Sequence, residues 1–148
     1  MRSLWLALVL FLLPSTTSAG QLQSGQSWII LVSNSADIST LSKNQVINLF
    51  LGRTKFLPNG LKVRAYDFNE GAGTRAHFYQ VLTGKHIAHI DAYWARLKYS
   101  GRASPPSAVE NIKTLLERVQ NQTSAITYLP STHRKMIEHY RVKIVLQL

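Results

Sequence analysis

Hydrophobic runs and polar breaks alternate along the chain in a way that predicts strands and helices in turn. Residues 28–32 form a continuous apolar run rich in branched side chains, which is typical of a strand buried on both faces. Residues 61–66 alternate between apolar and polar positions, as expected of a second strand. The pattern predicts further strands at residues 123–129 and 142–146.

Between these strands, apolar residues recur at spacings of three and four, which indicates helices with one buried face. Ser42 and Gln45 fit a capping box at the start of the first helix. Ser107 and Glu110 fit a second capping box, which predicts a helix beginning after Ser107. Two more helices are expected, one over residues 86–97 and one directly before it. Such alternation is typical of an α/β domain with a small sheet covered by helices.

The loop after the second predicted strand carries the clearest chemical signal. It reads Glu70-Gly71-Ala72-Gly73-Thr74 and opens a helix. A small-residue loop at a helix start presents backbone N–H groups that attract an anion. Arg75 is a cation in the first turn, where it opposes the helix dipole, so its presence indicates a role other than helix stability. The alternative is that the glycines only turn the chain between two elements.

The N-terminal residues have the features of a secretory signal. Arg2 provides a positive start, residues 4–13 are apolar, and small residues lead up to Ala19. The apolar run is too short to span a membrane as an anchor. We therefore predict that residues 1–19 are a cleaved signal peptide and that residues 20–148 form one domain.

Composition narrows the possible partners. The formal net charge is +10, which predicts attraction to anionic molecules. The basic residues are scattered, without a block of five, so no specific nucleic acid is expected as a partner. His86 and His89 share a helix face but lack a third ligand, so neither a metal site nor a cofactor is predicted. The serines and histidines do not form a recognisable catalytic triad, and the sequence does not indicate an enzyme.

Six motifs occur in an order that is similar to one known family. They are Leu49-Phe50-Leu51-Gly52-Arg53, Pro58-Asn59-Gly60, Gly71-Ala72-Gly73-Thr74-Arg75, Tyr93-Trp94, Tyr99-Ser100-Gly101 with Pro105-Pro106, and Ala125-Ile126-Thr127-Tyr128. Together they resemble the phosphate-binding periplasmic proteins of ABC transporters, and in particular their short, single-lobe relatives. The resemblance implies a periplasmic protein with a single-lobe, type II periplasmic-binding-protein-like α/β fold, in which helices flank a small mixed sheet.

The resemblance also implies where a ligand binds. In relatives with two lobes, phosphate lies between the lobes, against a glycine-serine-glycine-threonine loop at a helix start. Ala72 replaces that serine, and Phe68 stands where the relatives have an arginine, whose charge Arg75 would supply instead. The segment after the first strand would lie nearby if the sheet were parallel. The predicted anion-binding residues are thus Gly71, Ala72, Gly73, Thr74, Arg75, Ser33, Asn34 and Ser35.

Three functions remain open on the sequence. The first is a periplasmic solute-binding-like protein that binds phosphate or a similar small oxyanion and serves phosphate transport or sensing with an inner-membrane ABC transporter. The second is an accessory module that has the same fold without the ligand and docks on another envelope protein. The third is a basic protein that binds a polyanion such as DNA or lipopolysaccharide. A homodimer would rebuild a two-sided cleft.

Overall fold

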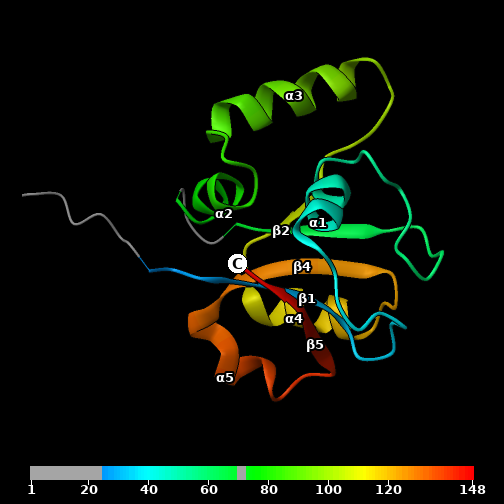
Figure 1. The fold of residues 1–148 in the computed structure, drawn as a ribbon, viewed down its shortest axis with the longest axis vertical. Helices are drawn as coiled ribbons and strands as arrows, with labels where there is room; N and C mark the ends of the chain where they lie inside the picture. The colour runs from blue at the N-terminus through cyan, green and yellow to red at the C-terminus, as the bar shows by residue number, and fades with distance from the viewer. Residues whose placement is uncertain (1–24, 70–72) are drawn as a thin grey trace, which may run out of the picture.

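The computed structural model describes residues 25–69 and 73–148, and within them the chain forms one five-stranded sheet (Figure 1). The strand order across the sheet is β3-β2-β4-β1-β5. β2 is parallel to both β3 and β4, whereas β1 is antiparallel to both β4 and β5. The strands are β1 (Trp28–Ser33), β2 (Arg64–Phe68), β3 (Ser107–Val109), β4 (Ala125–Pro130) and β5 (Val142–Gln147).

Helices cover both faces of this sheet. Figure 1 shows α1, α2 and α3 on one side of the strands and α4 and α5 on the other. Every residue of β1 and β4 is buried, because these central strands have helices on both faces. The helices are α1 (Lys43–Phe50), α2 (Thr74–Thr83), α3 (Ile87–Tyr99), α4 (Ile112–Gln120) and α5 (Arg134–Ile137), the last preceded by a 3₁₀ turn, η1 (Ser131–His133).

An aromatic cluster fixes α1 and α2 on the sheet. Phe78 of α2 stacks on Tyr128 of β4, with ring centroids 3.4 Å apart, and Phe50 of α1 meets both rings edge-on. Trp28, at the start of β1, packs against the same two rings, and its indole Nε1–H donates to Nδ1 of His77 at 3.2 Å. Edge-on ring contacts add to the stabilisation that burial already provides. The cluster therefore holds the start of α2 beside the start of β1.

The capping box at Ser42 is confirmed. The Ser42 side chain accepts from the backbone N–H of Gln45 at 3.2 Å, and the Gln45 side chain accepts from the Ser42 N–H at 2.8 Å. The helix expected over residues 86–97 is likewise present as α3. The final strand, expected at residues 142–146, is β5.

The second predicted capping box is wrong. Ser107 does not cap a helix but begins the edge strand β3, which pairs with Tyr66–Phe68 of β2. α4 begins later, at Ile112. Asn111 is its N-cap, and the Asn111 side chain accepts a hydrogen bond from the Thr114 N–H at 3.1 Å. Val109 is buried as a strand residue. Pairing with β2 provides hydrogen-bond partners for its backbone, and a local sequence pattern does not reveal such pairing.

The second strand starts later than its alternating pattern predicts. β2 covers Arg64–Phe68, and residues 61–63 instead belong to a hairpin closed by a bridge between Phe56 and Lys62. The Val63 N–H donates to the Lys55 carbonyl at 2.9 Å within this hairpin. Within the described residues, no helix is long and apolar enough to cross a membrane.

Candidate functional site

The predicted anion loop leads from β2 to α2. Gly71 and Ala72 lie outside the described residues, so only the end of the loop is placed by the structure. Gly73 is the N-cap of α2 and provides no side-chain hydrogen bond to the first turn. The helix starts directly beyond the carboxyl end of β2, as the sequence predicts, and its Thr74 and Arg75 are half-buried.

A buried carboxylate lies beneath this helix start. Asp67, in β2, is only 2% exposed. Its Oδ2 accepts from Arg75 Nε at 2.9 Å, and its Oδ1 accepts from the Tyr79 hydroxyl at 2.9 Å. Asp67 is therefore not a solvated loop residue but a buried residue of β2. It joins the end of β2 to the first two turns of α2.

The Arg75 guanidinium has a second carboxylate partner. Its Nη1 donates to Oδ1 of Asp91 in α3 at 2.8 Å, and its charge lies 5.1 Å from the centre of the Tyr79 ring. Arg75 thus connects β2, α2 and α3. This arrangement explains why a cation occupies the first turn of α2: two carboxylates offset its unfavourable position in the helix dipole.

Burial changes the acidity of the groups in this network. Removal from water raises the pKa of Asp67 above its ordinary value, although the hydrogen bonds and charge of Arg75 and the hydroxyl of Tyr79 act in the opposite direction. Burial also raises the pKa of Tyr79 well above its ordinary value, and the neighbouring Asp67 charge adds to that rise. Tyr79 is therefore a neutral hydrogen-bond donor near neutral pH.

Ser33, Asn34 and Ser35 do not lie beside the start of α2, and this expectation is wrong. β1 is antiparallel to β4 while β2 is parallel to it, so Ser33 is level with the beginning of β2 rather than its end. The two places are separated by about 13 Å along the sheet, at roughly 3.3 Å per strand residue. Ser33 is fully buried, and its hydroxyl donates to the Gln120 carbonyl at 3.1 Å, where α4 ends.

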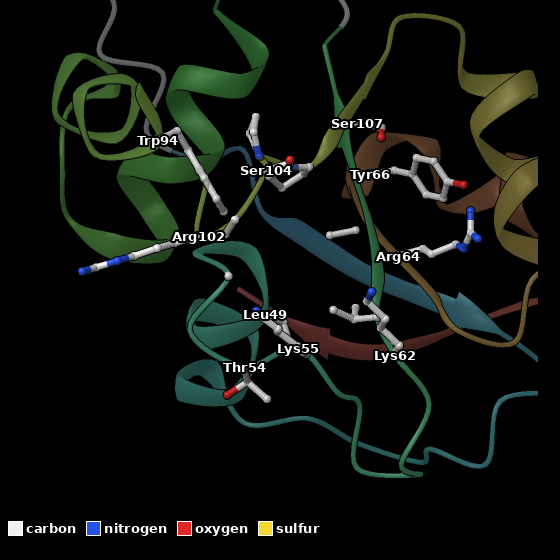
Figure 2. Close-up of a pocket in the computed structure, with 16 residues that line it drawn as sticks. Leu49, Thr54, Lys55, Lys62, Arg64, Tyr66, Trp94, Arg102, Ser104 and Ser107 are labelled. Atoms are coloured by element: carbon white, nitrogen blue, oxygen red, sulfur yellow. The ribbon is translucent and has the colours of Figure 1, made fainter. Parts of the chain in front are cut away.

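A strongly basic concavity lies near the beginning of β2 (Figure 2). This basic cleft has a volume of about 400 Å³ and runs between β2 and the segment that leads from α3 into β3. Among the described residues, its lining includes no acidic side chain and four cationic ones, Lys55, Lys62, Arg64 and Arg102. The cleft and the start of α2 are at opposite ends of β2.

Comparison with solved structures identifies proteins that share this fold. The chain matches an ABC-type phosphate transport receptor from Vibrio cholerae with a TM-score of 0.58 and 15% identity, over 81% of this chain and 45% of that one. It matches PstS from Borrelia burgdorferi with a TM-score of 0.62 and 12% identity, over 81% and 46%. The fold is that of a periplasmic-binding-protein lobe.

A third structure with this fold was solved with phosphate bound. It is a putative phosphate ABC transporter substrate-binding protein from Clostridium perfringens, matched with a TM-score of 0.55 and 12% identity over 82% of this chain and 54% of that one. The lobe described here therefore spans about half the length of these proteins. No protein-family model matches the sequence, and no curated protein matches it either.

Sequence reasoning missed all three partners of Arg75 in this lobe, which are Asp67, Tyr79 and Asp91. Tyr79 follows Arg75 by four residues, a spacing that puts both on one helix face, so this contact had a detectable signal. Asp91 lies on a different helix, and its pairing depends on how α3 packs against α2. The basic cleft was missed because its cations come from separate segments of the chain.

Proposed function

We propose that this lobe binds phosphate or a similar small oxyanion at the start of α2, in the periplasm, in the service of phosphate transport or sensing. One observation carries the proposal: α2 starts on a glycine N-cap directly beyond the carboxyl end of β2. Gly73 has no side chain to accept from the N–H groups of the first turn, and a bound anion would supply acceptors there. The fold that this chain shares with phosphate-binding proteins also supports the proposed function.

In this proposal the residues have different roles. The backbone N–H groups after Gly73 and the Thr74 hydroxyl donate to the anion. Arg75 contributes positive potential while its hydrogen bonds to Asp67 and Asp91 hold the first turn in place. The negative charge of the nearby Asp67 carboxylate would repel a dianion, which favours the singly charged form of phosphate over sulfate.

A thermal melt of the purified protein in phosphate-free buffer tests this function. Phosphate at one hundred times its dissociation constant should stabilise the protein by about 2.7 kcal/mol. Sulfate at matched ionic strength should not shift the midpoint, and Thr74→Val should reduce the shift by phosphate. Thr132→Val, an exposed threonine on η1, is the matched control. If sulfate shifted the midpoint as much as phosphate does, the result would count against the site. The same holds if Thr74→Val and Thr132→Val reduced the phosphate-induced shift equally.

Two observations favour the accessory module as a second candidate. Arg75 already pairs with two carboxylates, so its charge is largely offset without a ligand. Tyr99, at the end of α3, is 96% exposed and provides an apolar contact for an envelope protein or a second copy of the chain. Absence of any phosphate-dependent shift up to millimolar concentration, together with concentration-dependent self-association in size-exclusion chromatography, would favour this function.

A further inference from the structure

The hairpin between α1 and β2 carries exposed apolar side chains at its tip. Among the described residues four large apolar side chains are exposed, and two of them, Phe56 (55%) and Leu61 (41%), flank this turn. A bridge between Phe56 and Lys62 closes the hairpin, and Figure 1 shows it extending away from the body of the lobe. Because apolar area exposed to water is unfavourable, a projecting tip of this kind indicates a contact surface.

Phe56 and Leu61 lie on opposite faces of the hairpin. Phe56 is opposite Lys62, and the Leu57 N–H donates to the Leu61 carbonyl at 2.9 Å, so Leu57 and Leu61 form the next facing pair. Successive side chains of a strand alternate between faces, which places Leu61 on the face of the buried Leu57 and Phe56 on the face of Lys62. A groove on a protein partner would cover one of these faces, whereas a lipid interface surrounds an inserted tip on both.

The backbone of the tip is hydrogen-bonded within the hairpin. The Gly60 N–H donates to the Leu57 carbonyl at 2.9 Å, and the Leu61 N–H donates to Oδ1 of Asn59 at 3.1 Å. Pro58 has no N–H to satisfy. A backbone N–H without a partner is costly in lipid, so these internal bonds lower the cost of moving the tip into a membrane interface.

Cations flank the apolar tip without accompanying acids. Residues 53–64 contain neither aspartate nor glutamate, and they include four exposed cations, Arg53, Lys55, Lys62 and Arg64. In the described part of the chain, the ion pairs are both made by Arg75, outside this hairpin. Figure 2 shows Lys55 and Lys62 on the two strands of the hairpin, with its turn beyond them. An apolar tip flanked by cations complements a bilayer that carries anionic headgroups.

We propose that the hairpin of residues 53–64 docks this lobe on a membrane surface that contains anionic phospholipid. Phe56 and Leu61 enter the boundary between headgroups and acyl chains, while Lys55 and Lys62 contact the lipid phosphate groups. The hairpin leads into the beginning of β2, whereas α2 starts beyond the other end of that strand. The proposed phosphate site therefore stays outside the membrane contact.

A fluorescent label on the hairpin tests the proposal. The chain contains no cysteine, so Leu61→Cys provides a single position for an environment-sensitive nitrobenzoxadiazole label. Vesicles of equal parts phosphatidylcholine and phosphatidylglycerol should raise and blue-shift its emission, and vesicles of phosphatidylcholine alone should do so much less. The readout is local, so lipid contacts of the apolar residues 4–13 do not produce it.

The same label at Met136→Cys is the matched control. Met136 on α5 is 38% exposed and follows two cations, Arg134 and Lys135, so its local chemistry is close to that of the hairpin tip. The emission of this label should not change when anionic vesicles are added. An unchanged emission at position 61, or equal changes at positions 61 and 136, would overturn the proposal.

Co-sedimentation with the anionic vesicles measures what each side chain contributes. Lys62→Gln should lower the partition coefficient roughly fivefold at low salt, and raising the salt concentration should reduce this effect. Phe56→Ser should lower it by roughly the same factor at either salt concentration, because apolar burial is not screened. Lys135→Gln makes the same change in net charge on α5 and should leave partitioning nearly unchanged. Equal losses with Lys135→Gln and Lys62→Gln, in variants shown to be folded by circular dichroism, would indicate attraction to net charge alone and overturn the site.

Two further arms separate this proposal from its neighbours. Thr74→Val should leave vesicle binding unchanged, so failure of the phosphate site at α2 and failure of the hairpin contact are distinguishable. Duplex DNA of twenty base pairs tests the polyanion alternative. If DNA binds more tightly than the anionic vesicles and Phe56→Ser leaves vesicle binding unchanged, the hairpin is part of a polyanion surface and the membrane proposal is refuted.

Discussion

Arg75→Ala is the substitution whose effect the structure defines most closely. The change removes the cation from a carboxylate that is 2% exposed, while Arg75 itself keeps 19% of its side chain exposed. Loss of one partner from a buried ion pair destabilises a protein by about 3–5 kcal/mol, because the remaining charge stays buried without compensation. Since Arg75 is partly solvated, we expect the lower value, about 3 kcal/mol at pH 7.

The pH dependence of that loss follows from the acidity of Asp67. Its pKa in the folded protein lies above the ordinary value, so the stability of the folded state falls as pH rises through the interval between these two values. Arg75 lowers the pKa of Asp67, so removal of Arg75 extends this loss of stability to higher pH. The difference between Arg75→Ala and the wild type should therefore widen as pH rises and shrink as pH falls toward 3.8, the ordinary value.

Urea denaturation followed by circular dichroism at pH 7 and pH 4 measures both effects. Asp91→Asn is the control, because this second partner of Arg75 has a side chain 57% exposed and its loss should cost less than about 1 kcal/mol. In an Asp67→Asn background, Arg75→Ala should also cost about 1 kcal/mol or less, since no buried charge remains. An equal loss in both backgrounds, or at both pH values, would refute the account of a buried charge held by Arg75.

Two further predictions concern residues that the structure explains by packing. Ser33→Ala should destabilise the protein by about 1 kcal/mol, because it removes a buried donor from the Gln120 carbonyl. It should leave the phosphate-induced shift of the melting midpoint unchanged, and a loss of that shift would show that Ser33 contributes to the anion site. Gly52→Ala should lower the free energy of unfolding by more than about 2 kcal/mol, because Gly52 has φ +64° and a Cβ there would lie 2.7 Å from the Trp94 ring. The same contact should alter the near-ultraviolet circular dichroism of Trp94. Gly84→Ala, with φ +73° and open space, should cost only about 1 kcal/mol, and equal losses at the two glycines would contradict the contact with Trp94.

The sequence by itself determined most elements of the fold and their class. The apolar run of β1, the capping box at Ser42 and the helical stripe of α3 are local features, and each predicts its element from neighbouring residues. The order of motifs also indicated the periplasmic-binding-protein fold, which the solved structures share. The connection of β2 to α2 through a glycine loop was likewise readable, because it depends on adjacent residues.

Strand direction and pairing were decided by the tertiary structure. The apolar pattern of a buried strand is the same in either direction, so the sequence did not show that β1 is antiparallel to β4. That direction moves Ser33 away from the start of α2. Tertiary structure also decided the edge strand β3, which begins at Ser107. Three residues form a strand only where a neighbour such as β2 supplies hydrogen bonds.

The electrostatic sites were decided in the same way. Asp67 and Arg75 are close in sequence, but Asp91 joins them only because α3 packs against α2. Lys62 and Arg102 are forty residues apart, and the sequence shows them as scattered charges. Charge interactions depend on distance in space, and hydrophobic periodicity carries no information about which distant segments meet. Local patterns therefore identified the lobe and the start of α2, whereas the pairing of Arg75 and the basic cleft exist only in the folded chain.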